Sequence, residues 1–357
     1  MTNHLHIFMW VIILLKRFAA VIAFLFLIPF NCYGADNSAA SAIVMDAETG
    51  IVLYEKNAYE NRSMASTTKI MTALLAVESG KLDSNVKITS EMLDTEGTSL
   101  GLKPNDKITL YDLIVGMMLT SGNDSANAVA YYLCGGLEAF ANLMNERAKQ
   151  IGMESSFFVT PSGLDEGDHH STAYDMARLA AEAVKNETFC EIVSMKSAEI
   201  TISGIKVTVY NHNKLLAMDS DFFGIKTGFT TKAGRCLVSA KECDGNKLIC
   251  VTLNAPNDWQ DHINLMKECQ SSYVKREINA NINISAVGGS SDTVKCSYSA
   301  EIYTINEPDI RLYYHPFIYA PVKKGDIVGM AVICQNNKII ERLPIEADED
   351  LNYAKQE

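Results

Sequence analysis

The sequence predicts an α+β protein of two domains, in which a large domain of helices and strands is followed by a small all-β sandwich. Apolar residues recur at helical spacing in several runs between residues 66 and 183, and strand-like alternation dominates residues 198–253. After residue 285, only short alternating runs follow, separated by Gly, Asn and Pro. With 357 residues, of which 48% are hydrophobic, the chain is long enough for two cores.

The N-terminus has the composition of an export signal. A Lys-Arg pair at residues 16–17 precedes an apolar run, residues 18–30, and the small residue Gly34 follows. We therefore expect a signal peptide cleaved after Gly34 (residues 1–34), and a protein at the extracytoplasmic face of the membrane or in the wall space. The alternative is an uncleaved anchor, because residues 7–15 are also apolar.

Charge and cysteine content narrow the possible partners. The chain has 31 Lys+Arg and 43 Asp+Glu residues, a formal net charge of -12, which argues against nucleic acid and an anionic lipid surface as partners. Removing Cys32 with the signal leaves an even number of cysteines, so disulfides are possible. However, Cys236 and Cys250 lie in strand-like runs, where cysteine packs as a small apolar residue, so buried thiols are an equal alternative.

The stretch Ser66-Thr-Thr-Lys69 organises the first domain. Ile70 and Leu74 recur at helical spacing and Gly80 is placed to end the helix, so a buried helix should begin near Ser66. Residues three apart lie on one helix face, which brings the Lys69 amine within reach of the Ser66 hydroxyl. A partly desolvated lysine can lose its charge and accept the serine proton, which makes the alcohol a nucleophile.

The Ser-x-x-Lys pattern occurs four times, at Ser66, Ser84, Ser203 and Ser272, so its setting must decide between them. Ser84 and Ser203 precede strand-like runs, and Ser272 lies near the expected exposed end of a helix. Only Ser66 begins an apolar helix. We select it as the candidate nucleophile, the alternative being a helix N-cap serine beside a solvated lysine.

A second polar motif, Ser121-Gly-Asn123, lies between helices expected at residues 109–119 and 125–133. It should form a tight turn in which the glycine permits the bend and the two polar side chains face the space between the helices. The similar Ser125-Ala-Asn127 falls within the next helix, and we assign it to the helix surface or to capping.

A third motif, Lys226-Thr-Gly228, precedes a hairpin of strands expected at residues 236–242 and 247–253. On an edge strand, a glycine without a side chain lets the backbone of a ligand lie alongside. The neighbouring lysine and threonine supply a charge and a hydroxyl for a carboxylate. The alternative is an ordinary strand end with a solvated lysine.

The loop at residues 157–171 contains Asp165 and Asp168 with His169 and His170. A metal site is conceivable because both residue types are ligands. Adjacent histidines rarely chelate one ion together, however, and no helical pair of histidines supports them. We therefore expect a packed loop near the cleft and no metal.

Further patterns complete the domain plan. We expect these elements in chain order: a β-hairpin at 42–46 and 51–56, a helix at 137–151, an amphipathic helix from Thr172, strands within 198–210 and a helix at 259–276. The catalytic domain would then span residues 35–276, followed by a polar linker at 277–285 and a β-rich domain at 286–345. The acidic tail at 346–357 would be a poor membrane anchor, so any membrane attachment should come from an uncleaved N-terminus.

Together, in this order, the three motifs resemble those of the penicillin-recognising serine enzymes, the β-lactamase/transpeptidase group. Within it, stretches such as Met64-Ala-Ser-Thr-Thr-Lys69 and Gly224-Ile-Lys-Thr-Gly228 resemble the exported D-alanyl-D-alanine carboxypeptidases, the low-molecular-weight penicillin-binding proteins. The resemblance covers roughly residues 38–276. It implies an antiparallel sheet flanked by helices, together with an all-helical subdomain.

The resemblance also implies catalytic roles. Ser66 would attack the carbonyl between two D-alanines, with Lys69 as its general base, and form an acyl-enzyme that water hydrolyses. Ser121 would relay a proton to the leaving amine. The backbone N–H groups of Ser66 and Phe229 would form the oxyanion hole.

Substrate binding is implied in the same way. Asn123 would hold the Lys69 side chain and the substrate amide, and Lys226, Thr227 and Gly228 would bind the end of the substrate with its carboxylate. The implied partners are a peptidoglycan stem pentapeptide ending in D-Ala-D-Ala and β-lactam antibiotics as covalent inhibitors, with no cofactor.

Three alternatives remain at this stage. A β-lactamase or a D,D-endopeptidase would use the same fold, and a β-lactamase would need a deacylating glutamate. Glu166 is a candidate by position, but its Ser-Gly-Leu-Asp-Glu context does not resemble the corresponding loop of that family. A non-catalytic wall-binding scaffold is the third alternative, which the three intact motifs disfavour.

Overall fold

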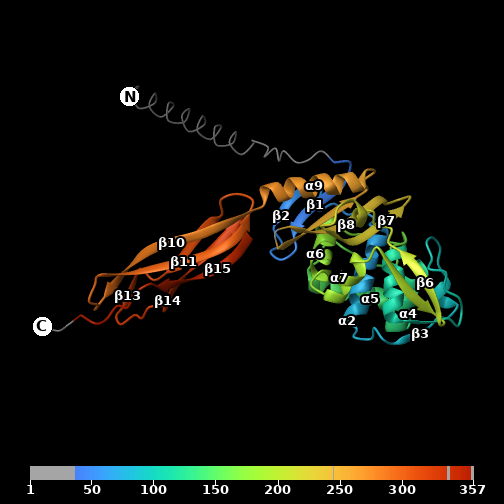
Figure 1. The fold of residues 1–357 in the computed structure, drawn as a ribbon, viewed down its shortest axis with the longest axis horizontal. Helices are drawn as coiled ribbons and strands as arrows, with labels where there is room; N and C mark the ends of the chain where they lie inside the picture. The colour runs from blue at the N-terminus through green and yellow to red at the C-terminus, as the bar shows by residue number, and fades with distance from the viewer. Residues whose placement is uncertain (1–36, 244, 336–337, 355–357) are drawn as a thin grey trace, which may run out of the picture. The chain divides into compact units, whose positions relative to one another are not determined.

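A five-stranded antiparallel sheet forms the centre of the first part of the chain in a computed structural model that describes residues 37–243, 245–335 and 338–354. Its strand order, β2-β1-β9-β8-β7, pairs the beginning of this part with its end (Figure 1). The strands are β1 (Ser41–Asp46), β2 (Val52–Lys56), β7 (Phe222–Thr230), β8 (Gly234–Cys243) and β9 (Asn246–Leu253). Because β7 is an edge strand, one side of its backbone is available to a ligand.

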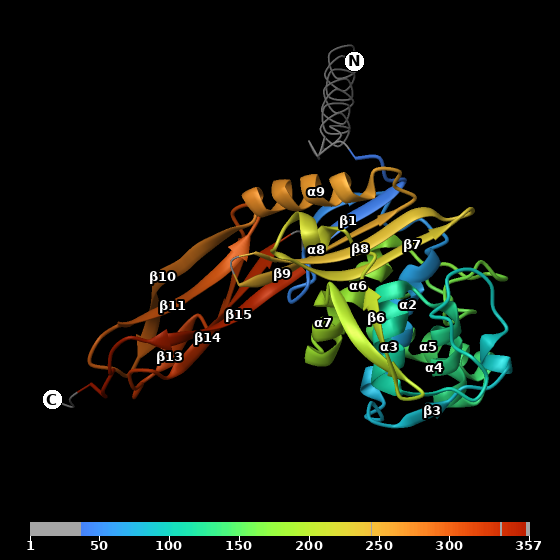
Figure 2. The same cartoon turned by 45° about the vertical axis from the view of Figure 1, so that its right-hand side comes forward.

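Helices cover both faces of this sheet. Helix α9 (Asp258–Ser272) lies along one face and α6 (Ala173–Ala183) lies against the other (Figure 2). His262 of α9 is completely buried, with its ring nitrogens 2.7 Å from Ser239 Oγ and 2.9 Å from Thr252 Oγ1. The helix expected at residues 259–276 therefore packs on the sheet.

The helical part of the domain lies under the sheet and surrounds α2, in which nine of ten residues are buried. Caps fix two of its helices, because the Thr109 and Thr172 hydroxyls accept hydrogen bonds from the N–H groups of Asp112 and Asp175. The main helices are η1 (Ala65–Thr68), α2 (Lys69–Glu78), α3 (Leu110–Thr120), α4 (Asn123–Cys134), α5 (Leu137–Ile151) and α7 (Glu187–Ser194). Short elements join them: β3 (Asn85–Lys87), η2 (Glu91–Leu93), β4 (Lys107–Thr109), β5 (Ser197–Ile202), β6 (Ile205–Tyr210) and α8 (Leu215–Met218).

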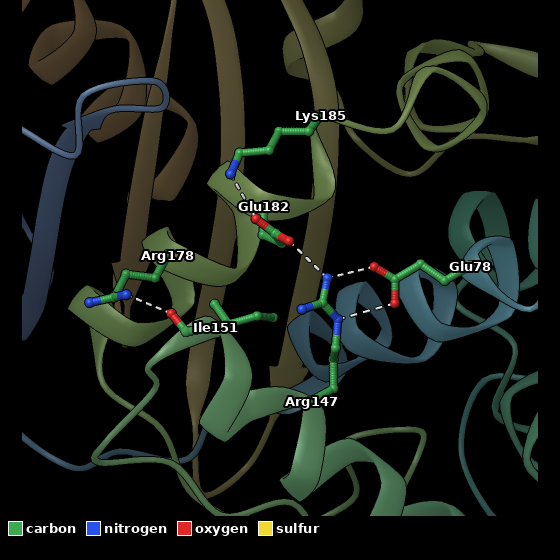
Figure 3. A network of polar contacts seen from close by, with 6 residues as sticks. All are labelled: Glu78, Arg147, Ile151, Arg178, Glu182 and Lys185. Atoms are coloured by element: carbon green, nitrogen blue, oxygen red, sulfur yellow. Dashed lines mark hydrogen bonds and ion pairs between the residues drawn. The ribbon is translucent and has the colours of Figure 1, made fainter.

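A polar network ties α2, α5 and α6 together at their surface (Figure 3). The Arg147 guanidinium donates two hydrogen bonds, of 2.6 and 3.1 Å, to the Glu78 carboxylate. It donates a third, of 2.8 Å, to the Glu182 carboxylate. In the same view, Arg178 donates to the carbonyl oxygen of Ile151 and so satisfies the end of α5. These contacts fix α2, the helix that follows the candidate nucleophile, against its neighbours.

The second part of the chain is all-β, as predicted. Its strands are β10 (Val274–Val287), β11 (Thr293–Thr304), β12 (Asp309–Tyr314), β13 (Phe317–Tyr319), β14 (Ile327–Gln335) and β15 (Lys338–Ala347). They form one hydrogen-bonded sheet in the order β12-β14-β15-β11-β10-β13, with a hydrophobic cluster of its own. Where the sequence predicts only short alternating runs, residues 293–304 form one continuous strand, β11.

The predicted polar linker is wrong. Helix α9 ends at Ser272, not at residue 276, and residues 277–285 lie within strand β10. Asn279, Asn281 and Asn283 alternate with apolar residues that pack on the second core. Asparagine is depleted in strands and its frequency here favours a linker, but the period of two is the stronger signal.

The predicted boundary at residue 345 is also wrong, because β15 continues to Ala347. Leu351 is buried and pairs with Val322, and Tyr353 pairs with Gly289, so the acidic tail packs on the sheet as far as it is described. In the described part of the chain, no helix is both long and apolar enough to span a membrane. The predicted signal peptide and its cleavage site lie outside the described residues.

Candidate active site

Ser66 and Lys69 meet at the mouth of helix α2, as the sequence predicts. Ser66 lies in the 3₁₀ turn that leads into the helix, and Lys69 is the first α-helical residue. Lys69 Nζ lies 2.9 Å from Ser66 Oγ. The lysine is completely buried, whereas Ser66 is partly exposed and lines a cavity.

Two further contacts fix the orientation of the lysine amine. Lys69 Nζ donates to Asn123 Oδ1 and to the backbone oxygen of Ser162, each over 2.7 Å. Both partners are acceptors, because Asn123 Nδ2 donates to the Glu96 carbonyl and a carbonyl oxygen has no proton. A neutral amine has two N–H bonds and one lone pair, so these acceptors leave the lone pair for the Ser66 hydroxyl.

The charge state of Lys69 fits this arrangement. Burial lowers the pKa of Lys69 well below its ordinary value, and the nearby Lys226 ammonium lowers it further, against the opposing charge of Asp124. A buried amine of this kind can accept the proton of a serine hydroxyl.

The turn between α3 and α4 brings Ser121 and Asn123 to the same site. The expectation that glycine makes the bend is wrong, since Ser121 itself has a left-handed backbone with φ 64°, whereas Gly122 has φ -58°. Glycine is needed there for a different reason, because a Cβ on it would lie 2.9 Å from Asp124 Oδ1 and 3.1 Å from Leu100 N.

The second Ser-x-Asn sequence is part of the protein interior. Ser125 and Asn127 lie in α4 and are 0% and 4% exposed, so the expected position on the helix surface is wrong. They belong to the first turns of a helix whose N-terminal end is enclosed by the residue 94–102 loop, which Asp124 holds through the N–H groups of Leu100 and Gly101.

Strand β7 places Lys226, Thr227 and Gly228 opposite the nucleophile. A Cβ at Gly228 would lie 3.0 Å from the backbone nitrogen of Ser66, so only glycine allows this close approach. Lys226 is 1% exposed and donates to the Thr227 carbonyl over 2.9 Å. Burial lowers its pKa to about 7.

The three motifs border one open cavity of about 1350 Å³. Its lining includes these candidate residues: Ser66, Ser121, Thr227, Gly228 and Phe229. Three buried candidate residues lie beneath that lining: Lys69, Asn123 and Lys226. Lys69 bonds to Ser66 and to Asn123, and Lys226 bonds to the Thr227 carbonyl. The cavity continues along β7 past His212 to Trp259 at the start of α9. It therefore offers an extended peptide both an edge strand and a serine nucleophile.

Comparison with known proteins decides the family. The sequence profile of the peptidase S11 family, D-alanyl-D-alanine carboxypeptidase, matches residues 30–257. The chain belongs to this family. It is 31% identical over 374 residues to the D-alanyl-D-alanine carboxypeptidase DacC of Escherichia coli, covering 93% of this chain and 90% of the relative. The corresponding enzyme DacF of Bacillus subtilis is 29% identical over 89% of this chain and 87% of its own length.

Solved structures of similar proteins share the fold. The carboxypeptidase DacD of Francisella tularensis has a TM-score of 0.68 at 26% identity, covering 90% of this chain and 95% of that one. Penicillin-binding protein 5 of Haemophilus influenzae has a TM-score of 0.67 at 26% identity, covering 89% and 98%. The Streptomyces K15 DD-transpeptidase covers 67% of this chain and 99% of its own, with a TM-score of 0.63 at 31% identity.

Several residues of this family member's site escaped the sequence reasoning. The Ser162 and Glu96 carbonyls contact Lys69 and Asn123 through backbone atoms, which leave no signal in residue type. His169 lies in the loop that we expect to pack near the cleft, and its two ring nitrogens contact Thr68 Oγ1 and the N–H of Val159. The sequence alone does not show that this histidine is buried, with its ring against that of Phe158.

The two cysteines placed in strands are buried thiols. Cys236 in β8 and Cys250 in β9 are both 0% exposed and unpaired. Burial raises the pKa of Cys236 to about 11 and that of Cys250 well above its ordinary value, so both stay protonated and act as small apolar residues. The alternative of packed thiols is confirmed at these two positions.

Proposed function

We propose that this protein is a serine-type D-Ala-D-Ala carboxypeptidase that removes the terminal D-alanine from peptidoglycan stem peptides through an acyl-enzyme on Ser66. The supporting observation is the position of Ser66 Oγ, 2.9 Å from a buried lysine amine whose other two hydrogen-bond partners are acceptors. Family membership supports the reaction, and this geometry supports Ser66 as its nucleophile.

In the first step, Lys69 Nζ takes the hydroxyl proton as Ser66 Oγ bonds to the carbonyl carbon between the two D-alanines. The carbonyl oxygen becomes an oxyanion, held by the N–H groups of Ser66 and Phe229. The C–N bond then breaks, and the proton passes through Ser121 to the leaving amine. Water hydrolyses the remaining ester, which releases the shortened peptide and restores the Ser66 hydroxyl.

Binding of the substrate carboxylate falls to Lys226 and Thr227. A carboxylate beside the buried Lys226 ammonium would favour its charged form and offset the cost of burial. Gly228 leaves room for the substrate backbone along β7, and Asn123 Nδ2, which donates to the Glu96 carbonyl, would also donate to the substrate amide. The substrate class is a stem pentapeptide ending in D-Ala-D-Ala, and β-lactams, which mimic this end, would acylate Ser66.

The same geometry bears on the alternatives. A β-lactamase needs a group that activates the deacylating water, and Glu166, the candidate by position, is an exposed residue of the loop before α6. This favours slow hydrolysis of a penicilloyl enzyme. A D,D-endopeptidase would use the same residues on a cross-linked peptide.

We further propose that the catalytic unit ends with α9, that residues 274–354 form a separate β domain, and that residues 1–34 direct export. Two separate hydrophobic clusters support the division. An enzyme that trims the stem peptides of the wall must act outside the cytoplasm. The basic and apolar N-terminus supports such a location.

Ser66→Ala is the test. It should abolish both the release of D-alanine from a peptide ending in D-Ala-D-Ala and covalent labelling by a fluorescent penicillin. Ser84→Ala, at another Ser-x-x-Lys sequence outside the site, should leave both unchanged. Labelling that survives in Ser66→Ala would refute the assigned nucleophile, and mass spectrometry would show whether wild-type enzyme removes one alanine or cleaves a cross-link.

A further inference from the structure

The residue before the candidate nucleophile, Ala65, has an unusual backbone conformation. Ala65 has a left-handed backbone with φ 50°, although alanine disfavours this region by about 1–2 kcal/mol. Gly163 packs directly on its carbonyl, because a Cβ there would lie 1.9 Å from Ala65 O. Such a conformation persists only where its surroundings fix it.

A chain of three buried hydrogen bonds ends at this carbonyl. The N–H of Val159 donates to His169 Nδ1 over 2.9 Å, so that nitrogen must be the acceptor and Nε2 carries the proton. His169 Nε2 then donates to Thr68 Oγ1 over 2.9 Å. The Thr68 hydroxyl donates in turn to Ala65 O, also over 2.9 Å.

The direction of every bond is determined, because Val159 N–H can only donate and Ala65 O can only accept. His169 is 2% exposed and Thr68 is 0% exposed, so water does not compete with the chain. Burial lowers the pKa of His169 to about 4, which keeps the imidazole neutral with one acceptor nitrogen near neutral pH.

This carbonyl shares a planar peptide bond with the backbone N–H of Ser66. The C=O and N–H of a trans peptide point in opposite directions, so fixing one fixes the other. On the opposite side from the chain lies Gly228 of β7, whose absent Cβ would stand 3.0 Å from Ser66 N. The Ser66 N–H therefore points to the β7 side of the peptide bond, where the substrate would lie.

We propose that His169 and Thr68 are positioning residues for the oxyanion hole, which aim the Ser66 N–H at the substrate by anchoring the Ala65 carbonyl. The inference rests on the proposed acylation of Ser66. It assigns no proton transfer to His169, which touches neither the nucleophile nor the lysine in the hydrogen bonds of the described residues.

The test compares three threonine variants by the rate of acylation with penicillin. Thr68→Val keeps the shape but removes the hydroxyl, and should lower the acylation rate about tenfold or more, since loss of a whole oxyanion donor costs about 10²- to 10³-fold. Thr68→Ser keeps the hydroxyl and should restore most of the rate. Thr72→Val is the matched control, because Thr72 is equally buried on α2 and its hydroxyl also donates to a carbonyl, that of Pro161.

A spectroscopic readout separates aiming from general damage. Hydrogen bonds from the oxyanion hole lower the stretching frequency of the ester carbonyl in the acyl-enzyme, so infrared difference spectra should show a higher frequency in Thr68→Val. The frequency should stay at the wild-type value in Thr68→Ser and Thr72→Val. His169→Ala should shift it in the same direction as Thr68→Val, and serves in its place if that variant does not fold.

The outcomes are distinct. Wild-type protein that penicillin does not acylate would refute the proposed function itself. Wild-type protein that is acylated, together with unchanged rate and carbonyl frequency in folded Thr68→Val or His169→Ala, would refute this inference alone. Equal losses in Thr68→Val and Thr72→Val, without a frequency shift, would show only a structural role and also refute it.

Discussion

The backbone carbonyl oxygen of Ser162 lies 2.7 Å from Lys69 Nζ. With Asn123 Oδ1 it accepts both N–H groups of a neutral amine, so the lone pair is left for the Ser66 hydroxyl. The Ser162 carbonyl thereby helps to orient the buried amine that we propose as the base.

Lys69→Arg should abolish acylation. Arginine keeps a positive charge under all conditions in proteins and has no lone pair to accept the serine proton. We expect the rate of labelling by fluorescent penicillin to fall by about 10²- to 10⁴-fold, the usual contribution of a general base. Thermal unfolding would establish that the variant is folded, and a folded Arg variant that labels within tenfold of wild type would refute the role of Lys69.

Lys226→Gln should move the acid limb of the acylation rate to higher pH. Burial is the largest cause of the lowered pKa of Lys69, and the positive charge of Lys226 is the second. Removing this charge therefore raises the pKa of Lys69. The neutral, active form of Lys69 then appears only at higher pH. Penicillin acylation measured across pH would give the midpoint. Lys232→Gln, on the exposed turn after β7, is the control and should leave the midpoint near that of wild type.

The value of kcat/KM for a peptide ending in D-Ala-D-Ala should decline above pH 7. Burial lowers the pKa of Lys226 to about 7, so the free enzyme loses the cation for the substrate carboxylate as the pH rises through that value. The same peptide with a C-terminal amide has no carboxylate to bind and should lack this limb. An identical alkaline decline for both peptides would argue against Lys226 as the carboxylate site.

Gly163→Ala should damage both stability and activity, whereas Gly167→Ala in the same loop should cost only the backbone strain and leave activity unchanged. Both glycines have positive φ, 86° and 52°, which costs alanine about 1–2 kcal/mol in each case. Only at Gly163 would the new Cβ collide with a backbone atom, 1.9 Å from Ala65 O, whereas Gly167 faces open space. Urea unfolding and penicillin labelling of both variants measure the difference, and equal effects would contradict the close approach.

Arg147→Met should lower the free energy of unfolding by about 1 kcal/mol, because it breaks a two-bond contact with Glu78 and a second contact with Glu182 in a partly buried network. Lys206→Met, which removes the exposed pair with Glu199, should cost close to nothing and is the control. Chemical denaturation at neutral pH measures both.

The contribution of Arg147 to the free energy of unfolding should also decrease as the pH falls. Hydrogen bonds from Lys185 and then Arg147 lower the pKa of Glu182, so its stabilising effect is present above the unfolded pKa of glutamate. It is lost as the pH falls through the lower, folded value. The difference in unfolding free energy between wild type and Arg147→Met should therefore shrink in acid, and a difference that grew in acid would contradict this network.

Local patterns were sufficient for much of the fold. The period of 3.6 residues placed α3 and α5 within a residue or two, and the hairpin of β8 and β9 followed from alternation. In the asparagine-rich strand β10, residue composition and the period of two residues disagree, and there the prediction from composition failed. Predictions from residue type also failed at the Ser121 turn, because the bend is made by a serine that its neighbours hold at φ 64°.

By itself, the sequence determined which side chains we propose for the chemistry, since the Ser66, Ser121 and Lys226 motifs contain a hydroxyl, an amide and a cation in the residues themselves. Only the tertiary structure decided how these groups are aimed. The Ser162 carbonyl at Lys69 and the His169 chain to Ala65 depend on backbone atoms and on burial, which arise only when a distant loop packs against α2. Burial also sets the pKa of both lysines, because the cost of a charge depends on the surroundings that folding creates.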